Sequence, residues 1–302
     1  MYDVLIIGSG PAGMTAGIYS ARREMKSLII GKNLGGQVMW TSEIENYPGF
    51  KSINSYELIS RIQEQVSGLG VEVKMEEIKK LEKENNLFTV QTAEKKYQSK
   101  AVILATGLFP RRLEIEGEEK FTGRGISYCA NCDAPFYKDK TVAVVGGGNS
   151  AIDAAEVLSK IAKKVYLIHR RQEFRAFDSL VTEVKKRRNI EFILESEVQE
   201  IKGEEKLEKI KVRGGREDGE KEIEIDGMFI EIGRVADTDW IAEWVERDEY
   251  KQILVDEKYQ TKTPGLFAAG DVTKGEFKQI TIACGQATIA SLASYQYIQK
   301  YF

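Results

Sequence analysis

The chain has 302 residues, of which 42% are hydrophobic and 30% charged, and this length predicts about two globular domains. A net charge of −3 gives no indication of a nucleic-acid partner, and the apolar runs fall far short of the roughly 20 residues that cross a bilayer. One histidine and three cysteines exclude a histidine-based zinc site, a Ser-His-Asp triad elsewhere in the chain and a disulfide scaffold.

The chain opens with a predicted strand, a glycine-rich turn and a helix. Apolar residues 4–7 run into a Gly-x-Gly-x-x-Gly pattern, and a helix-compatible stretch follows to Arg23. In such a turn the first glycine permits the bend, the second lets a phosphate approach and the third allows close helix packing. The candidate pyrophosphate ligands are Gly8, Ser9, Gly10, Pro11, Ala12 and Gly13.

A second strand is predicted at 28–30, about 20 residues after this turn. An acidic residue that binds a ribose is expected at its end, but Gly31 and Lys32 occupy the place. Another group must therefore hold that ribose.

Two cysteines form a Cys-x-x-Cys pair, Cys129 and Cys132, in a protein without the cysteine content of a secreted scaffold. A vicinal dithiol can accept electrons and pass them to a disulfide. A metal site would need two more soft ligands, and only Cys284 and His169 are available, so we expect no metal. Asp133 is a candidate proton donor or acceptor in thiol exchange, with helix capping or a solvated position as the alternative. Cys284 is expected to be a buried structural residue.

The pattern of strand, glycine turn and helix occurs again near the middle of the chain. Apolar residues 142–145 precede the turn, and another predicted strand follows at 165–169. Two such starts in one chain predict two nucleotide-binding domains. The candidate phosphate ligands of the second are Gly146, Gly148, Asn149, Ser150 and Ala151.

The end of the strand at 165–169 is basic where a site for NAD is acidic. Guanidinium groups match phosphate geometry, so this segment predicts a site for the 2′-phosphate of NADPH, with a solvated basic turn as the alternative. The candidate residues are His169, Arg170, Arg171 and Arg175.

The C-terminal segment has no glycine fingerprint of its own and ends in a predicted helix from about 280 to 301. We therefore expect it to complete the first domain, which makes the second domain an insertion. The predicted fold is α/β, with two Rossmann-like three-layer nucleotide-binding domains. The expected boundaries are 1–112 and 237–302 for the first domain and 113–236 for the second.

Taken together, these motifs resemble those of the low-molecular-weight thioredoxin reductases over essentially the whole chain. The resemblance implies an FAD domain interrupted by an NADPH domain that carries the Cys-x-x-Cys pair. It implies that electrons pass from NADPH to FAD, to the cysteine pair and then to thioredoxin or a thioredoxin-like protein. It also implies a homodimer, and we expect a cytoplasmic protein without a membrane or nucleic-acid partner.

The resemblance extends the FAD site beyond the first turn. The matching positions are Gly35, Gly36, Gln37, Asn46, Thr106, Gly107, Gly270, Asp271, Lys278, Gln279 and Ile280. By the same resemblance Asp271 binds the ribityl chain, Cys132 lies nearest the flavin, Cys129 attacks the partner disulfide, and Asp133 is the proton donor.

Several positions depart from the family pattern. Ala134 replaces a glycine after Asp133, Lys278 replaces an arginine, and Gln286 lies where the family often has a small or acidic residue. Residues 233–238 also differ from the family's Gly-x-x-Pro-Asn-Thr. These departures bear on the identity of the protein substrate more than on the chemistry.

Two other functions share most of these motifs. One is a flavoprotein that supports a peroxiredoxin, or an NAD(P)H oxidase that releases peroxide. The other is a redox-sensing or nucleotide-sensing protein that binds flavin without turnover, against which the intact dithiol and Asp133 argue.

Overall fold

The computed structural model describes residues 1–40, 43–214 and 219–302. The chain divides into two compact units. Unit 1 comprises Met1–Phe109 and Val235–Phe302, and unit 2 comprises Pro110–Arg234. The chain crosses between them in two short strands, β9 (Phe109–Pro110) and β18 (Arg234–Val235), which pair with each other.

Unit 1 is built on a largely parallel sheet with β1 near its centre. The order is β5-β2-β1-β8-β7-β6, and β19 pairs in parallel with β8. β1, β2, β5 and β8 are parallel, whereas β6 and β7 add an antiparallel hairpin. The bounds are β1 (Tyr2–Ile7), β2 (Ser27–Gly31), β5 (Glu72–Met75), β6 (Ile78–Glu84), β7 (Leu87–Thr92), β8 (Lys96–Leu104) and β19 (Leu266–Ala268).

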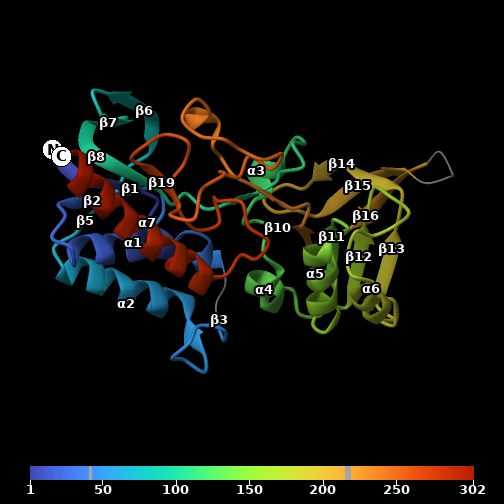
Figure 1. The fold of residues 1–302 in the computed structure, drawn as a ribbon. Helices are drawn as coiled ribbons and strands as arrows, with labels where there is room; N and C mark the ends of the chain where they lie inside the picture. The colour runs from blue at the N-terminus through green and yellow to red at the C-terminus, as the bar shows by residue number, and fades with distance from the viewer. Residues whose placement is uncertain (41–42, 215–218) are drawn as a thin grey trace. The chain divides into compact units, whose positions relative to one another are not determined.

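Alternate side chains of β1 enter two separate cores, as expected for a strand covered on both faces. Val4 and Ile6 pack among the helices α1 (Pro11–Ala21), α2 (Ser55–Gly68) and α7 (Ile280–Tyr301). These three helices run side by side in Figure 1. Small residues let α1 and α7 approach closely, and the hydroxyl groups of Ser20 and Ser291 hydrogen-bond at 3.0 Å.

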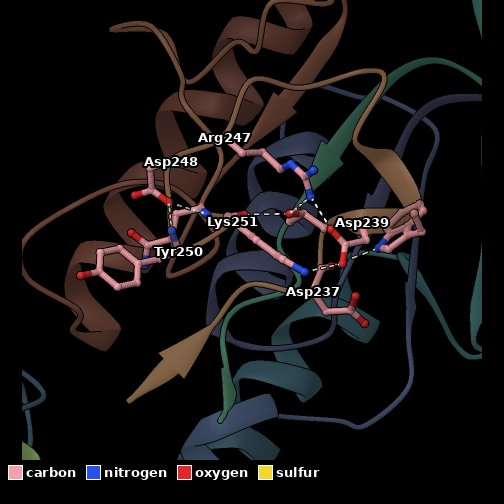
Figure 2. A network of polar contacts seen from close by, with 9 residues as sticks. Asp237, Asp239, Arg247, Asp248, Tyr250 and Lys251 are labelled. Carbon is pink, nitrogen blue, oxygen red and sulfur yellow. Dashed lines mark hydrogen bonds and ion pairs between the residues drawn. The ribbon is translucent and has the colours of Figure 1, made fainter. Parts of the chain in front are cut away.

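The second face of the unit 1 sheet is covered by residues 236–255 and the β6–β7 hairpin. A network of polar contacts secures this segment just after β18 (Figure 2). The carboxylate of Asp239 accepts hydrogen bonds from Arg247 and Lys251, and the buried Thr238 hydroxyl donates to the Lys251 carbonyl at 2.7 Å. The remaining short elements of unit 1 are η1 (Gly36–Trp40), β3 (Glu43–Ile44), β4 (Ile53–Asn54) and η3 (Asp239–Ile241).

Unit 2 repeats the architecture with a five-stranded parallel sheet of order β10-β17-β11-β12-β13. A three-stranded antiparallel sheet, β14-β15-β16, packs against it through a second core. The strands are β10 (Ile126–Ser127), β11 (Thr141–Val145), β12 (Lys164–Ile168), β13 (Ile190–Ile193), β14 (Ser196–Lys202), β15 (Lys209–Gly214), β16 (Glu220–Glu224) and β17 (Gly227–Ile230). The helices are α3 (Glu118–Phe121), α4 (Ala130–Asp133), η2 (Ala134–Tyr137), α5 (Asn149–Ser159) and α6 (Asp178–Lys185).

The predicted α/β fold with two Rossmann-like halves is confirmed, although some element bounds differ. α1 begins three residues earlier than the sequence pattern indicated, because Pro11 fits the first helical position. Ile253 forms isolated bridges with Arg247 and Thr273. Among the described residues, no helix has the length and apolar character needed to span a bilayer.

Candidate functional site

The first glycine turn requires glycine at two positions for packing reasons. Gly8 has φ +116°, and a Cβ there would lie 2.1 Å from the carbonyl oxygen of Ala105 on the neighbouring chain segment. A Cβ on Gly13 would lie 1.8 Å from the Gly8 carbonyl oxygen. Gly10 is the N-cap of α1, and a Cβ there would meet only the Gly35 carbonyl oxygen, at 3.8 Å. The turn therefore keeps space over the start of α1.

The missing ribose acid has a steric explanation. Gly31 lies beside Gly8 at the end of β2, and a Cβ at Gly31 would lie 2.3 Å from the Ser9 hydroxyl oxygen. That hydroxyl donates to the Asn33 carbonyl at 2.9 Å, which fixes its orientation. The Ser9 side chain thus fills the space that an acidic residue at position 31 would need.

A loop from β2 and a turn after β19 meet beside the first glycine turn. The Gly35 N–H donates to the Ser9 carbonyl at 2.8 Å, and Gln37 donates from Nε2 to Oδ2 of Asp271 at 3.1 Å. Gly107 has φ +69°, and a Cβ there would lie 3.4 Å from Gln37 Nε2. Residues that are distant in sequence, Gln37, Gly107 and Asp271, therefore lie together.

The segment before α7 contributes two further predicted residues. Gln279 is the N-cap of α7, and its side-chain oxygen accepts a hydrogen bond from Asn46 Nδ2 at 3.0 Å. Lys278 donates from Nζ to the carbonyls of Asp271, at 3.2 Å, and Thr273, at 2.6 Å. Burial lowers the pKa of Lys278, against the opposing charges of Asp271 and Asp248. Ile280 begins α7, and Thr106 follows the Ala105 carbonyl that contacts Gly8.

These residues fit a dinucleotide pyrophosphate. In the described structure no side chain caps α1, and its first turn carries no acidic residue, so its first N–H groups and positive dipole end are available to an anion. Within unit 1 every predicted residue of the first site belongs to the turn itself or to the loops and helix end that adjoin it.

The second glycine turn has the same backbone with different neighbours. Gly146 has φ +150°, and a Cβ there would lie 2.3 Å from the Glu231 carbonyl oxygen. Gly148 is the N-cap of α5, and a Cβ there would meet no described heavy atom within 4 Å. The first turn of α5 carries no acidic side chain. This turn therefore also fits a phosphate group.

The basic segment lies against the second turn. A Cβ on Gly147 would lie 2.2 Å from the His169 ring, so the imidazole covers this glycine. The ring stacks on Phe174 with centroids 5.3 Å apart, and the Arg175 N–H donates to the Gly147 carbonyl at 2.7 Å. Burial lowers the pKa of His169, and the charges of Arg170, Arg171 and Arg175 lower it further. His169 is thus a buried packing residue that holds exposed arginines beside the turn.

Unit 2 also carries the cysteine pair: Cys129 is the N-cap of the short helix α4, and Cys132 lies within it. The Cys129 N–H donates to the Ser127 hydroxyl at 3.0 Å, and the Cys129 carbonyl accepts from the Asp133 N–H at 3.2 Å. Cys129 is disulfide-bonded. The side chains of Asn131 and Cys132 lie outside the described residues, so the predicted role of the Cys132 thiol stays a prediction.

A buried carboxylate that the sequence interpretation missed contacts the residue that precedes the cysteine pair. Glu118 accepts hydrogen bonds from the N–H groups of Leu113 and Glu114 and, at 2.7 Å, from the Tyr128 hydroxyl. Burial, together with this bond, raises the pKa of Tyr128 to about 12. Because Tyr128 immediately precedes Cys129, Glu118 ties the start of unit 2 to the redox segment.

The third cysteine is separate from this chemistry. Cys284 is free and half-buried on α7, with Sγ 3.9 Å from the Pro11 carbonyl oxygen. Burial raises the pKa of its thiol, which disfavours the reactive thiolate.

Comparisons with known proteins bear on this combination of two glycine turns and a cysteine pair. A family model described as pyridine nucleotide-disulphide oxidoreductase matches residues 2–287. The chain belongs to this family. It is 37% identical to a thioredoxin reductase of Peptoclostridium acidaminophilum, over the whole chain and 98% of that protein. It is 39% identical to a thioredoxin reductase of Listeria monocytogenes, over 99% of the chain and 95% of that protein.

A solved structure shows the same likeness. The thioredoxin reductase of Lactococcus lactis, in a crystal structure described as the FR conformation, matches with a TM-score of 0.84. It is 37% identical and covers 99% of this chain and all of that chain. The protein is therefore an oxidoreductase of a flavoprotein family, and membership implies FAD and a nicotinamide nucleotide as cofactors.

Proposed function

We propose that this protein is an NADPH-dependent, FAD-containing reductase of the disulfide of thioredoxin or a thioredoxin-like protein. The observation that carries the proposal is one chain with two uncapped glycine-turn helices and a disulfide-bonded cysteine on a short helix. Full-length likeness to thioredoxin reductases supports the choice of partner.

Unit 1 is the proposed FAD domain. The N–H groups at the start of α1 bind the pyrophosphate, and Asp271, oriented by Gln37, binds the ribityl chain. Gly35, Gly36, Thr106 and Gly107 shape the site, and Asn46, Lys278, Gln279 and Ile280 line its flavin end. When bound, FAD accepts two electrons from the nicotinamide and passes them to a disulfide.

Unit 2 is the proposed NADPH domain. Gly146, Gly148, Asn149, Ser150 and Ala151 present backbone N–H groups to the pyrophosphate. Arg170, Arg171 and Arg175 bind the 2′-phosphate, and His169 holds them in place by packing on Gly147. The proposed limits from the sequence, 113–236, enclose these residues and the cysteine pair.

The cysteine pair transfers electrons to the partner by thiol–disulfide exchange. The Cys129 thiolate forms a bond with one sulfur of the partner disulfide, and the second partner sulfur leaves as a thiolate. The Cys132 thiolate then attacks Cys129, which releases the first partner sulfur and leaves a Cys129–Cys132 disulfide. Asp133 is the proposed donor of the proton that the leaving thiolate takes up.

Both the dithiol and the nicotinamide must reach the flavin, and Cys129 must also meet a protein partner. We therefore propose that unit 2 rotates on the β9 and β18 crossings between the two steps, as hinge motions in other enzymes do. A homodimer and a cytoplasmic location belong to the same proposal.

Cysteine variants test the proposal. Cys129→Ser and Cys132→Ser should each abolish disulfide reduction while NADPH still bleaches the flavin absorbance. Cys284→Ser is the matched control and should retain turnover, since its thiol has no role in exchange. Steady-state assays with several oxidised thioredoxin-like proteins identify the partner.

Two results would overturn the proposal. A colourless, folded protein that takes up no FAD would remove the flavin site. Rapid peroxide release with NADPH and no turnover with any thioredoxin-like protein would indicate an oxidase or a peroxiredoxin-supporting flavoprotein instead.

A further inference from the structure

The turn that carries Asp271 lies where three elements of unit 1 meet. Gly270 follows β19, has φ +80°, and is buried. A Cβ on Gly270 would lie 2.9 Å from the Cβ of Ala12 on α1 and 3.6 Å from the Cβ of Ala283 on α7. The Gly270 N–H is buried at this junction, so it needs a hydrogen-bond acceptor.

Gln286 on α7 is that acceptor. Its Oε1 accepts a hydrogen bond from the Gly270 N–H at 2.8 Å and lies 3.4 Å from the Thr273 hydroxyl. Thr273 is fully buried, and both its N–H and its hydroxyl donate to the Gly270 carbonyl, at 3.0 and 2.8 Å. One side-chain oxygen thus contacts both ends of the turn 270–273.

Lys278 secures the same turn through different atoms. Its ammonium donates to the carbonyls of Asp271 and Thr273, so it fixes the C-terminal part of the turn. With both polar contacts in place, the backbone on either side of Asp271 is fixed, and Gln37 then orients the carboxylate.

We propose that Gln286 is a positioning residue that holds the turn 270–273 in the conformation in which Asp271 meets the flavin ribityl chain. This inference rests on the proposed FAD site in unit 1. Gln286 acts through the backbone of Gly270 and the hydroxyl of Thr273. A turn fixed before binding lowers the ordering cost of binding, so the side chain raises the affinity for FAD.

Four variants of the full-length protein test this role. Gln286→Leu removes the acceptor, Gln286→Asn shortens it, and Gln286→Glu retains it. Gln296→Leu is the matched control, since Gln296 is an exposed glutamine on the same helix. The readouts are the Kd of FAD for the apo-protein and amide hydrogen exchange in a peptide that covers 268–274.

We expect Gln286→Leu to weaken FAD binding about tenfold, because a buried N–H loses its partner, and to speed exchange in the turn. Gln286→Glu should keep slow exchange and an affinity within about threefold of the wild type, and Gln286→Asn should lie between. Gln296→Leu should match the wild type. If Gln286→Leu does not fold, the test is whether Gln286→Asn binds FAD more weakly and exchanges faster in the turn than Gln286→Glu.

Unchanged FAD affinity and exchange in Gln286→Leu would overturn the positioning role, and so would equal losses in the Glu and Asn variants. A failure of the proposed function looks different. In that case the wild type itself does not bind FAD, while exchange in its turn still reports whether Gln286 holds Gly270.

Discussion

The two glycine turns have similar backbones but differ in where a side chain fills the space between the turn and the next strand. In both, the first glycine lies beside the end of the next parallel strand and against a carbonyl oxygen, of Ala105 in unit 1 and of Glu231 in unit 2. In unit 1 the next turn residue, Ser9, has a side chain, and Gly31 at the strand end has none. In unit 2 Gly147 has none, and His169 at the strand end covers it.

Under the proposed function, this difference adapts the same kind of turn to two different nucleotides. Where the strand ends in Gly31, that position presents no side chain to the turn, and the Ser9 side chain fills the adjacent space. Where it ends in His169, the buried ring packs on Gly147 and Phe174 at the start of a basic loop beside the second glycine turn. Under the proposed function, the residue at the end of the second strand is what distinguishes the two nucleotide sites.

The largest expected effect comes from removing the basic loop. Arg170→Ala with Arg171→Ala should lower kcat/KM for NADPH by roughly two to four orders of magnitude, since each charge-assisted bond contributes about 1.5 to 3 kcal/mol. Efficiency with NADH should change little. Arg188→Ala, an exposed arginine outside the loop, is the control, and equal efficiency with both nucleotides in the wild type would refute the assignment.

A second prediction concerns what the two turns have in common. Gly8→Ala and Gly146→Ala should each lower the free energy of unfolding by about 3 to 5 kcal/mol, because both positions combine positive φ with a carbonyl contact under 2.5 Å. Gly68→Ala, at an open helical position, should be neutral or stabilising. Denaturant titration monitored in each unit measures the change. An unchanged free energy of unfolding with alanine at position 8 or 146 would show that the two turns do not share the same requirement for glycine.

A third prediction concerns the residue whose carbonyl oxygen contacts the first glycine of each turn, which is Ala105 in unit 1 and Glu231 in unit 2. Unit 2 has Glu231 where unit 1 has Ala105, and burial raises the pKa of Glu231 to about 7 from an ordinary value of 4.5. A raised carboxyl pKa stabilises the fold below pH 4.5, and that contribution is lost as the pH rises through 7.

Glu231→Gln removes the cost of burying the charge. At pH 8 it should therefore raise the free energy of unfolding by up to about 3 kcal/mol relative to the wild type, with the difference shrinking toward pH 5. Glu197→Gln, on an exposed side chain, is the control. A difference that does not vary with pH would show that folding does not shift the pKa of Glu231.

The smallest predicted effect tests directly whether the turn residue and the strand-end residue fill the same space. Gly147→Ser should cost about 1 to 3 kcal/mol by displacing the His169 ring. Adding His169→Gly, which copies the arrangement of unit 1, should recover about 1 kcal/mol as coupling between the two sites. A double-mutant cycle from denaturant titrations measures this coupling, and strictly additive costs would contradict the complementary packing.

The sequence predicted the parts of the site that depend on local backbone. The glycine turns, the basic loop and the cysteine pair are each contained in about ten residues, so their spacing alone indicates their chemistry. The contact between Gln37 and Asp271 joins residues 234 positions apart, and only the family resemblance placed them in one site. Spacing along the sequence carries no information about such long-range contacts.

Three structural findings had no usable signal in the sequence. The absence of an acid at Gly31 was visible, but its cause, the Ser9 side chain, depends on the packing of β1 beside β2. Gln286 was visible only as a departure from the family pattern, and its contact with Gly270 joins α7 to the end of β19. From the sequence Glu118 would be taken for a charged surface residue. In the structure it accepts hydrogen bonds from Tyr128 and two backbone N–H groups.

The central claim, that each turn binds its own nucleotide, is tested most directly by hydrogen–deuterium exchange on the full-length protein. FAD added to the apo-protein should protect the peptides around 8–13, 35–37 and 270–271. NADP⁺ added to the FAD-bound protein should then protect those around 146–151 and 169–175 and leave the first set unchanged. Protection of the first turn by NADP⁺, or of the second turn by FAD, would contradict the account.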